Sequence, residues 1–335
     1  MRAVELDGSG QWSGLRSQDR PDPVAGPGEV LVSMRAASLN YRDLMIIDGR
    51  YRVQGKDGMV PLSDGAGEVV AVGPGVTRFA AGTRVMSVFF PRWHGGRPTA
   101  SVLADQPGST RDGVLAELVV FPEAGLVPIP DQLSYEEAAT LPCAGVTSWA
   151  ALQGPLPVAP GHRVLALGSG GVSMFALQFA KLAGAEVIVT TSSEEKAVRL
   201  KAYGADHIVN YRAQPDWHRA VRQIAPEGVD HVIENGGIGS LSRSIRACAT
   251  GGVINLIGVL SEPEDFDHTP LIWSICDIRR VTVGSTADVL AMLRAIDYAK
   301  LRPVLDQVFE LNQTAEAFEH FAAQRHIGKV VIRIS

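Results

Sequence analysis

The chain has 335 residues, 46% of them hydrophobic and 20% charged, and its formal net charge is −5. This length suffices for two domains with separate cores, and the composition is that of a globular protein rather than a disordered or fibrous one. The mild negative charge argues against a nucleic-acid partner.

Three features of the sequence predict a cytoplasmic protein with no membrane partner. No apolar run approaches the length of a membrane span. The first residues read as a strand, without the apolar core of a signal peptide. The three cysteines, Cys143, Cys248 and Cys276, are odd in number and widely spaced, which indicates neither a disulfide framework nor a metal cluster.

Residues 1 to about 125 have the composition of an antiparallel barrel or sandwich. Apolar and polar residues alternate over 28–38, and apolar stretches at 68–76 and 113–120 are flanked by turn residues. We therefore predict a β-rich domain, the catalytic one, over residues 1–125.

From about residue 126 the pattern changes to alternating strands and helices, after a capping box of Ser134 and Glu137. Strands are predicted at 163–167, 186–190, 206–210, 230–234 and 252–258, and helices at 172–183, 194–203 and 239–249. This alternation predicts a doubly wound parallel Rossmann sheet over 126–275, inserted into the β-rich domain. The remainder, 276–335, carries a predicted helix at 315–324 and a strand at 329–334 and returns to that domain.

The glycine-rich turn after strand 163–167 predicts a dinucleotide site. Gly168, Gly170 and Gly171 stand between a buried strand and a helix that continues through Val172. A pyrophosphate can approach backbone N–H groups at a helix N-terminus where side chains are absent. Ser173 occupies the place of the usual third glycine, which mainly controls how closely helix and strand pack.

Several segments together give the sequence a resemblance to the medium-chain dehydrogenase/reductase superfamily over essentially its whole length. They are 27–32 (PGEVLV), 39–44 (LNYRDL), 64–73 (DGAGEVVAVG), 141–147 (LPCAGVT), the glycine turn, 204–211 (GADHIVNY) and 328–332 (GKVVI). Each is weak alone, but their order and spacing are specific. The resemblance implies a nicotinamide-dependent oxidoreductase.

The positions that correspond to zinc ligands in the superfamily predict that this chain holds no zinc. Catalytic zinc needs three protein ligands and an open position. Asn40 stands where zinc members have their first cysteine, and Ser63 stands where they have a histidine. Only Cys143 falls on a ligand position, and it is interpreted as a buried small hydrophobe. Residues 90–115 contain no cysteine, so no structural zinc lobe is expected.

The segment after strand 186–190 favours NADPH over NADH. It reads Thr-Thr-Ser-Ser, where NAD enzymes place an acid that binds the ribose 2′-OH. Ser192 and Lys196 suit a 2′-phosphate, and the resemblance adds Tyr211 to them. The alternative is a capping box of Ser192 and Glu195 with a solvated Lys196. The resemblance also implies that Thr147, Gly258 and Gly284 contact the nicotinamide and that Asn235 flanks its ribose.

Three residues of the segment 40–51 are the candidate catalytic groups. Without a metal, the substrate must be polarised by hydrogen bonds and must receive a proton as hydride arrives. Asn40, Tyr41 and Tyr51 lie on the segment that lines the active site in relatives, and a tyrosine recurs there eleven residues after the asparagine. Tyr51 is the expected proton donor, with water as the alternative donor if Tyr51 only packs an apolar wall.

Two further segments suggest a lid and a dimer. The aromatic loop that contains Phe90 and Trp93 is a candidate cover for a flat substrate, although such clusters more often belong to a core. Residues 279–285 resemble the edge strand through which relatives join sheets in a homodimer.

The function expected from the sequence is the zinc-independent, NADPH-dependent reduction of a quinone or an α,β-unsaturated carbonyl compound. A first alternative is alcohol/ketone interconversion within the same superfamily. A second is an NADPH-binding protein with a non-catalytic role.

Overall fold

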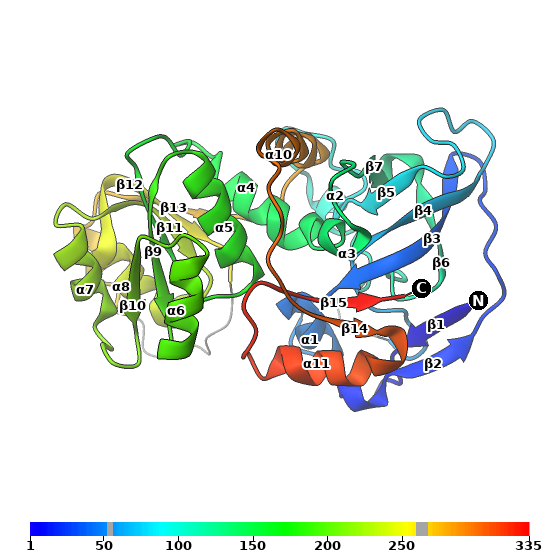
Figure 1. The fold of residues 1–335 in the computed structure, drawn as a ribbon, viewed down its shortest axis with the longest axis horizontal. Coiled ribbons are helices and arrows are strands. Elements are labelled where there is room, and N and C mark those ends of the chain that lie inside the picture. The colour runs from blue at the N-terminus through cyan, green and yellow to red at the C-terminus, as the bar shows by residue number, and fades with distance from the viewer. Residues whose placement is uncertain (52–55, 259–266, 335) are drawn as a thin grey trace. The chain divides into compact units, whose positions relative to one another are not determined.

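The computed structural model describes residues 1–51, 56–258 and 267–334, and these form two compact units. Unit 1 consists of Met1–Val146 and Gly284–Ser335, and unit 2 of Thr147–Val283 (Figure 1). The predicted boundaries at 126 and 276 therefore shift to 147 and 284. Residues 126–146 stay with unit 1 because their strand pairs within its sheet, and residues 277–280 stay with unit 2 because they pair with its sheet.

Unit 1 is built on a seven-stranded sheet in the order β14-β15-β3-β4-β5-β7, with β6 also paired to β3. Its strands are β3 (Glu29–Ser38), β4 (Asp64–Val72), β5 (Arg84–Ser87), β6 (Leu118–Pro122), β7 (Leu126–Pro128), β14 (Leu305–Glu310) and β15 (Lys329–Arg333), beside a separate pair β1 (Arg2–Glu5) and β2 (Arg16–Asp19). All neighbours are antiparallel except β14 and β15. The C-terminal strand β15 lies next to β3, so the two ends of the chain meet in one sheet (Figure 1).

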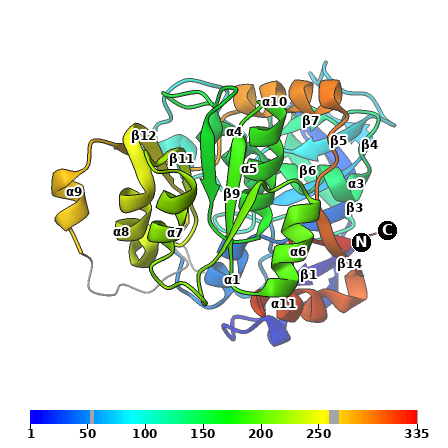
Figure 2. The ribbon, with the colours of Figure 1, turned by 60° about the vertical axis from the view of Figure 1, so that its left-hand side comes forward.

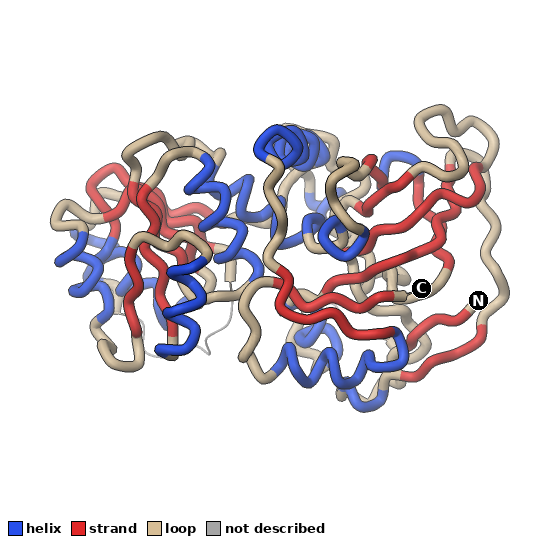
Figure 3. Tube along the Cα trace, in the orientation of Figure 1, coloured by secondary structure: helices blue, strands red, loops and turns tan. Residues whose placement is uncertain are grey.

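Five α-helices and a π-helical turn among the described residues complete unit 1, beside short 3₁₀ turns, and Figure 3 shows their places around its sheet. They are α1 (Tyr41–Ile47), α2 (Ala100–Leu103), α3 (Tyr135–Ala138), the short π-helical turn Leu141–Gly145, α10 (Thr286–Ala299) and α11 (Thr314–Ala322). The apolar positions of β3 alternate into the core, as its sequence predicts. The capping box of Ser134 and Glu137 is present at α3.

Unit 2 is the predicted doubly wound parallel sheet, in the order β10-β9-β8-β11-β12-β13. Its strands are β8 (Arg163–Ala166), β9 (Glu186–Thr191), β10 (His207–Asn210), β11 (Val229–Glu234), β12 (Cys248–Leu256) and β13 (Asp277–Arg280). Its helices are α5 (Gly171–Leu182), α6 (Glu194–Ala202), α7 (Trp217–Ile224), α8 (Ile238–Ala247) and α9 (Thr269–Trp273), and α4 (Val146–Leu152) begins at the unit boundary. Helices α5 and α6 lie on one face of the sheet and α7 and α8 on the other (Figure 2).

Most of the predicted elements of unit 2 occur within two or three residues of their expected bounds. Each central strand is buried nearly throughout, as expected of a sheet that helices cover on both faces. In unit 1 the stretch 113–120 forms a strand only from Leu118, because its first residues bond to the loop 60–62 instead. Among the described residues, no helix has the length and apolarity that crossing a membrane requires.

Candidate active site

Three neighbouring strands of unit 1 bring Asn40, Asp64 and Lys329 together. Asn40 follows the end of β3, and Asp64 and Lys329 are the first residues of β4 and β15, which flank β3 on its two sides. The Lys329 ammonium donates to Asn40 Oδ1 at 2.6 Å and to Leu39 O at 2.5 Å. Because Oδ1 accepts this bond, the amide nitrogen of Asn40 is the end left to donate. That nitrogen is buried, and a hydrogen bond from the Asn40 side chain lowers the pKa of the Asp64 carboxyl.

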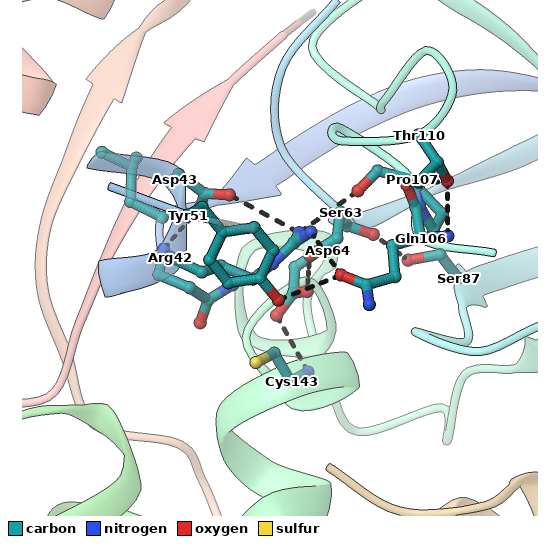
Figure 4. Close-up of polar contacts among 12 residues, drawn as sticks. Arg42, Asp43, Tyr51, Ser63, Asp64, Ser87, Gln106, Pro107, Thr110 and Cys143 are labelled. Carbon is teal, nitrogen blue, oxygen red and sulfur yellow. Dashed lines mark hydrogen bonds and ion pairs between the residues drawn. The ribbon is translucent and has the colours of Figure 1, made fainter. Parts of the chain in front are cut away.

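Opposite charges compensate one another in this buried cluster. Asp64 is fully buried; burial raises the pKa of its carboxyl, and Lys329 opposes that shift. Burial lowers the pKa of Lys329, and Asp64 opposes that shift in turn. Both oxygens of Asp64 accept hydrogen bonds, from Ser63 Oγ at 2.7 Å and from the Cys143 amide at 3.0 Å (Figure 4). The Asp64 carboxylate is thus surrounded by hydrogen-bond donors, which a buried charge requires.

Asp43 serves the fold rather than acid–base chemistry. Its carboxylate accepts a hydrogen bond from the backbone N–H of Asn40 at 2.7 Å and so caps α1. Burial raises its pKa to about 6, and Arg42 opposes the shift. The cap fixes the chain at Asn40 and therefore supports the direction of that side chain.

A second polar cluster of unit 1 surrounds Tyr51. The Tyr51 hydroxyl donates to Gln106 Oε1 at 3.0 Å. Arg42 donates to the same oxygen at 3.2 Å and to Pro107 O at 3.2 Å, and its guanidinium carbon lies 5.2 Å from the centroid of the Tyr51 ring. Figure 4 shows Arg42, Tyr51 and Gln106 converging, with Asp64 and Cys143 beside them.

The other predicted residues of unit 1 have different surroundings. Tyr41 is half-buried, and its hydroxyl accepts from Arg50 at 3.4 Å. Phe90 is 2% exposed and packs on the rings of Phe89 and Trp93. The lid interpretation of Phe90 is therefore corrected: its ring belongs to the core of unit 1. Trp93 is partly exposed and donates from its indole nitrogen to Gly96 O.

In unit 2 the glycine turn has the geometry that a pyrophosphate site needs. Gly168 has φ +80°, and Gly170 is the N-cap of α5, with Gly171 and Val172 as the first helical residues. A Cβ added to Gly168 or Gly170 would meet no atom within 4 Å, so the backbone faces open space. The N–H groups of the first turn of α5 are available to an anion there.

Ser173 shows why a serine can replace the third glycine. Its hydroxyl donates to Leu167 O at 2.6 Å, and it accepts from Asn235 Nδ2 at 2.9 Å. The small side chain therefore fits between α5 and β8 and ties them together. The Asn235 amide nitrogen is consequently used within the fold, since it donates to Ser173 and to Leu167 O.

The end of β9 lies beside the glycine turn. Thr190 Oγ1 accepts from the Gly168 amide at 3.0 Å, and the Lys196 ammonium donates to Ser169 Oγ at 3.2 Å. Ser193, not Ser192, caps α6, so the capping box of Ser192 and Glu195 does not form.

The alternative view of Lys196 as merely solvated is also corrected by this contact. The Tyr211 amide donates to Thr191 O at 3.0 Å, so Tyr211 follows β10 at the same edge of the sheet.

The loop after β11 is organised by the buried Glu234. Its carboxylate accepts from the amides of Gly236 and Gly237 and from Ser240 Oγ. A Cβ at Gly258 would lie 1.6 Å from Asn235 O, so this position after β12 requires glycine for close approach. Thr147 is buried at the start of unit 2, and Gly284 is the first residue of the returning segment of unit 1.

Comparisons with known proteins agree with this architecture. A family model described as alcohol dehydrogenase GroES-like domain matches residues 26–131, and one described as zinc-binding dehydrogenase matches residues 171–297. A zinc-type alcohol dehydrogenase-like protein of Schizosaccharomyces pombe is 45% identical over 316 residues, covering 92% of this chain and 91% of its own length. The chain belongs to the medium-chain dehydrogenase/reductase superfamily.

Solved structures of superfamily members match the whole chain. One described as an NAD-dependent alcohol dehydrogenase has 37% identity and a TM-score of 0.91, covering 100% of both chains. A quinone oxidoreductase of Pseudomonas syringae pv. tomato has 27% identity and a TM-score of 0.83, covering 99% of both chains. This superfamily member is an NAD(P)H-dependent oxidoreductase.

Sequence reasoning missed the residues that support the candidate catalytic groups. Lys329 was part of a recognised segment but received no role, and Arg42 and Gln106 were not singled out. A lysine at the start of an apolar strand is a signal of a buried charge. The partners of Arg42 lie 64 and 65 residues away in the chain, so no local pattern reveals them.

Proposed function

We propose that this dehydrogenase/reductase transfers hydride from NADPH to a quinone or to the β-carbon of an α,β-unsaturated carbonyl compound, without zinc. The observation that carries the cofactor choice is the Lys196–Ser169 contact beside the glycine turn, at a sheet edge where no acid follows β9 directly. An ammonium and hydroxyls at this place complement a 2′-phosphate, whereas a carboxylate would repel it.

Titration of the purified protein with NADPH and NADH, followed by nicotinamide fluorescence, tests the cofactor proposal. Lys196→Ala is expected to weaken NADPH binding by about tenfold or more, the loss of one hydrogen bond to a charged group, and to leave NADH binding unchanged. Lys201→Ala, on the exposed side of the same helix, is the matched control. Tighter binding of NADH by the unmodified protein would contradict the proposal.

The donor set in unit 1 does not fit a catalytic zinc. Of the three ligand positions, only Cys143 offers a soft ligand, and burial raises the pKa of its thiol, which favours the neutral form over the thiolate that binds metal. The neighbouring Lys329 adds a positive charge at the same place. No group of three or more potential ligands occurs among the described residues. Elemental analysis of the purified protein is expected to find zinc well below one equivalent.

Substrate polarisation then falls to hydrogen-bond donors of unit 1. The amide nitrogen of Asn40 is suited to a carbonyl or quinone oxygen, because Lys329 holds the other end of the amide. Tyr51 is the proposed proton donor to the α-carbon. Tyr51→Phe is expected to lower kcat for enones by about a hundredfold, the lower range for general acids, with NADPH binding unchanged. Full activity of this variant would assign the proton to water.

Alcohol/ketone interconversion is the rival function, favoured by the likeness to the NAD-dependent alcohol dehydrogenase. It predicts stoichiometric zinc, preference for NADH and oxidation of simple alcohols. A panel of quinones, enones, ketones and alcohols, assayed with both cofactors, separates the two functions. NADPH binding without turnover of any of these compounds would instead favour the non-catalytic role.

A further inference from the structure

We propose that Arg42 and Gln106 are positioning residues that set the direction of the Tyr51 hydroxyl and stabilise the charge it acquires when its proton leaves. This inference rests on the proposed role of Tyr51 as proton donor. Neither residue belongs to the predicted site, and both reach Tyr51 from other elements, Arg42 from α1 and Gln106 from the loop after α2.

The side-chain amide of Gln106 has one possible orientation. Its Nε2 donates to Leu103 O at 2.7 Å, so Oε1 must face the other way. The main chain of Gln106 is itself fixed, because its amide donates to Thr110 Oγ1 at 2.9 Å and its carbonyl accepts from Thr110 Oγ1 at 3.2 Å. A fixed acceptor therefore stands in front of Arg42 and Tyr51.

Arg42 is held as firmly as its partner. It is 9% exposed, and its guanidinium donates to Pro107 O and to Gln106 Oε1. Its charge also lies over two rings, 5.2 Å from the Tyr51 centroid and 4.8 Å from the Phe89 centroid. A desolvated guanidinium over an aromatic face is attracted to the ring by electrostatics.

These contacts determine the direction of the proton on Tyr51. Gln106 Oε1 can only accept, so the Tyr51 hydroxyl must donate to it in the free enzyme. The lone pairs of the phenol oxygen then remain for an incoming hydroxyl or water. When substrate is reduced, the hydrogen turns from Gln106 towards the α-carbon while Arg42 keeps Gln106 in place.

The proton step balances without a further reagent. Bound NADPH would supply the hydride for the new C–H bond at the β-carbon, and the electron pair of the C=C bond would take the proton from Tyr51 at the α-carbon. The O–H bond of Tyr51 breaks, and the resulting phenolate recovers a proton from water. During this interval the Arg42 charge over the ring offsets the negative charge of the phenolate.

A double-mutant cycle on stability tests the contact without any assay of activity. Tyr51→Phe, Gln106→Met and the double variant are compared in thermal unfolding, with Gln18→Met on the exposed strand β2 as control. We expect the two single losses in Tm to be non-additive, because the second substitution removes a bond that the first has already broken. Additive losses would overturn the inference, whatever the enzyme proves to reduce.

The same variants test the positioning role in turnover. Gln106→Met is expected to lower kcat for an enone by about tenfold with little change in KM for NADPH, and to have no further effect in the Tyr51→Phe background. Gln106→Glu restores an acceptor for both donors but loses the bond from Nε2 to Leu103 O, so it is expected to recover only part of kcat. Arg42→Lys keeps the positive charge but loses the planar guanidinium that donates to Gln106 and Pro107 at once. An intermediate kcat is expected.

The outcomes separate this inference from the proposed function. If the losses in stability are coupled but Tyr51→Phe keeps its full kcat, the contact exists and the proton comes from elsewhere. That result would refute both the role of Tyr51 and the positioning inference. A large loss in Tyr51→Phe with an unaffected Gln106→Met would leave the proposed function standing and overturn the inference alone.

Discussion

At the scale of single residues, the opposite buried charges of Lys329 and Asp64 interact, and this interaction contributes to the stability of unit 1. Lys329→Met would leave the Asp64 charge buried without its partner, which typically costs about 3–5 kcal/mol. We expect the free energy of unfolding in urea to fall by about that amount. Adding Asp64→Asn should recover part of the loss, and a double variant less stable than Lys329→Met would contradict this account.

His231 gives unit 2 a dependence on pH that can be measured. Burial lowers its pKa to about 4, with the neighbouring His162 acting in the same direction. The unfolded chain therefore binds more protons than the folded one between pH 4 and 6.5, and stability rises with pH across this window. His231→Gln is expected to remove this rise in the free energy of unfolding, which amounts to about 3 kcal/mol over the whole window. An unchanged slope in urea unfolding between pH 4.5 and 7 would refute the prediction.

At the scale of elements, substitutions in the glycine turn and in the loop at Gly258 are expected to affect cofactor binding and stability differently. A methyl group at Gly170 meets open space in the free protein, yet it would stand where a pyrophosphate approaches the backbone. Gly170→Ala is therefore expected to keep Tm within a few degrees of the unmodified protein while NADPH binding weakens at least tenfold.

Gly258→Ala should behave in the opposite way. Its methyl group would overlap Asn235 O, so the two loops must move apart and both Tm and NADPH binding should fall. Circular dichroism melts and fluorescence titrations of the two variants check both statements. Equal effects of the two substitutions on Tm would show that the turn does not have the described shape.

The elements themselves differed in how far the sequence could predict them. Unit 2 was predictable because buried parallel strands are short apolar runs and each helix carries its own start and stop signals. α6 starts at Glu194 as predicted, but Ser193 caps it instead of Ser192, because both serines have the chemistry of a cap. The glycine turn and Lys196 were found from local pattern, whereas the partners of Tyr51 come from distant loops and depend on the folded backbone.

At the scale of the whole molecule, β13 (Asp277–Arg280) is an edge strand of the sheet of unit 2, and of the predicted residues 279–285 only Arg279 and Arg280 belong to it. Large apolar side chains beside it are exposed, namely Ile272 (70%), Trp273 (80%) and Ile275 (73%). We propose that this edge joins a second copy of the chain, since exposed apolar edges favour pairing. Trp273→Asp with Ile275→Lys should convert a dimer to a monomer in sedimentation velocity, whereas Tyr298→Asp, exposed on unit 1, should not.

The union of the first and last parts of the chain in unit 1 has a consequence for biosynthesis. The Lys329 ammonium reaches Leu39 O across 290 residues of sequence, while unit 2 is one continuous stretch. On the ribosome, unit 2 has all of its strands before β15 exists, so we expect it to fold first. Until β15 emerges, Ala36–Ser38 of β3 lack their partner strand on one side, and Asn40 lacks the lysine that orients it. The candidate active site is therefore completed only after β15 has been synthesised.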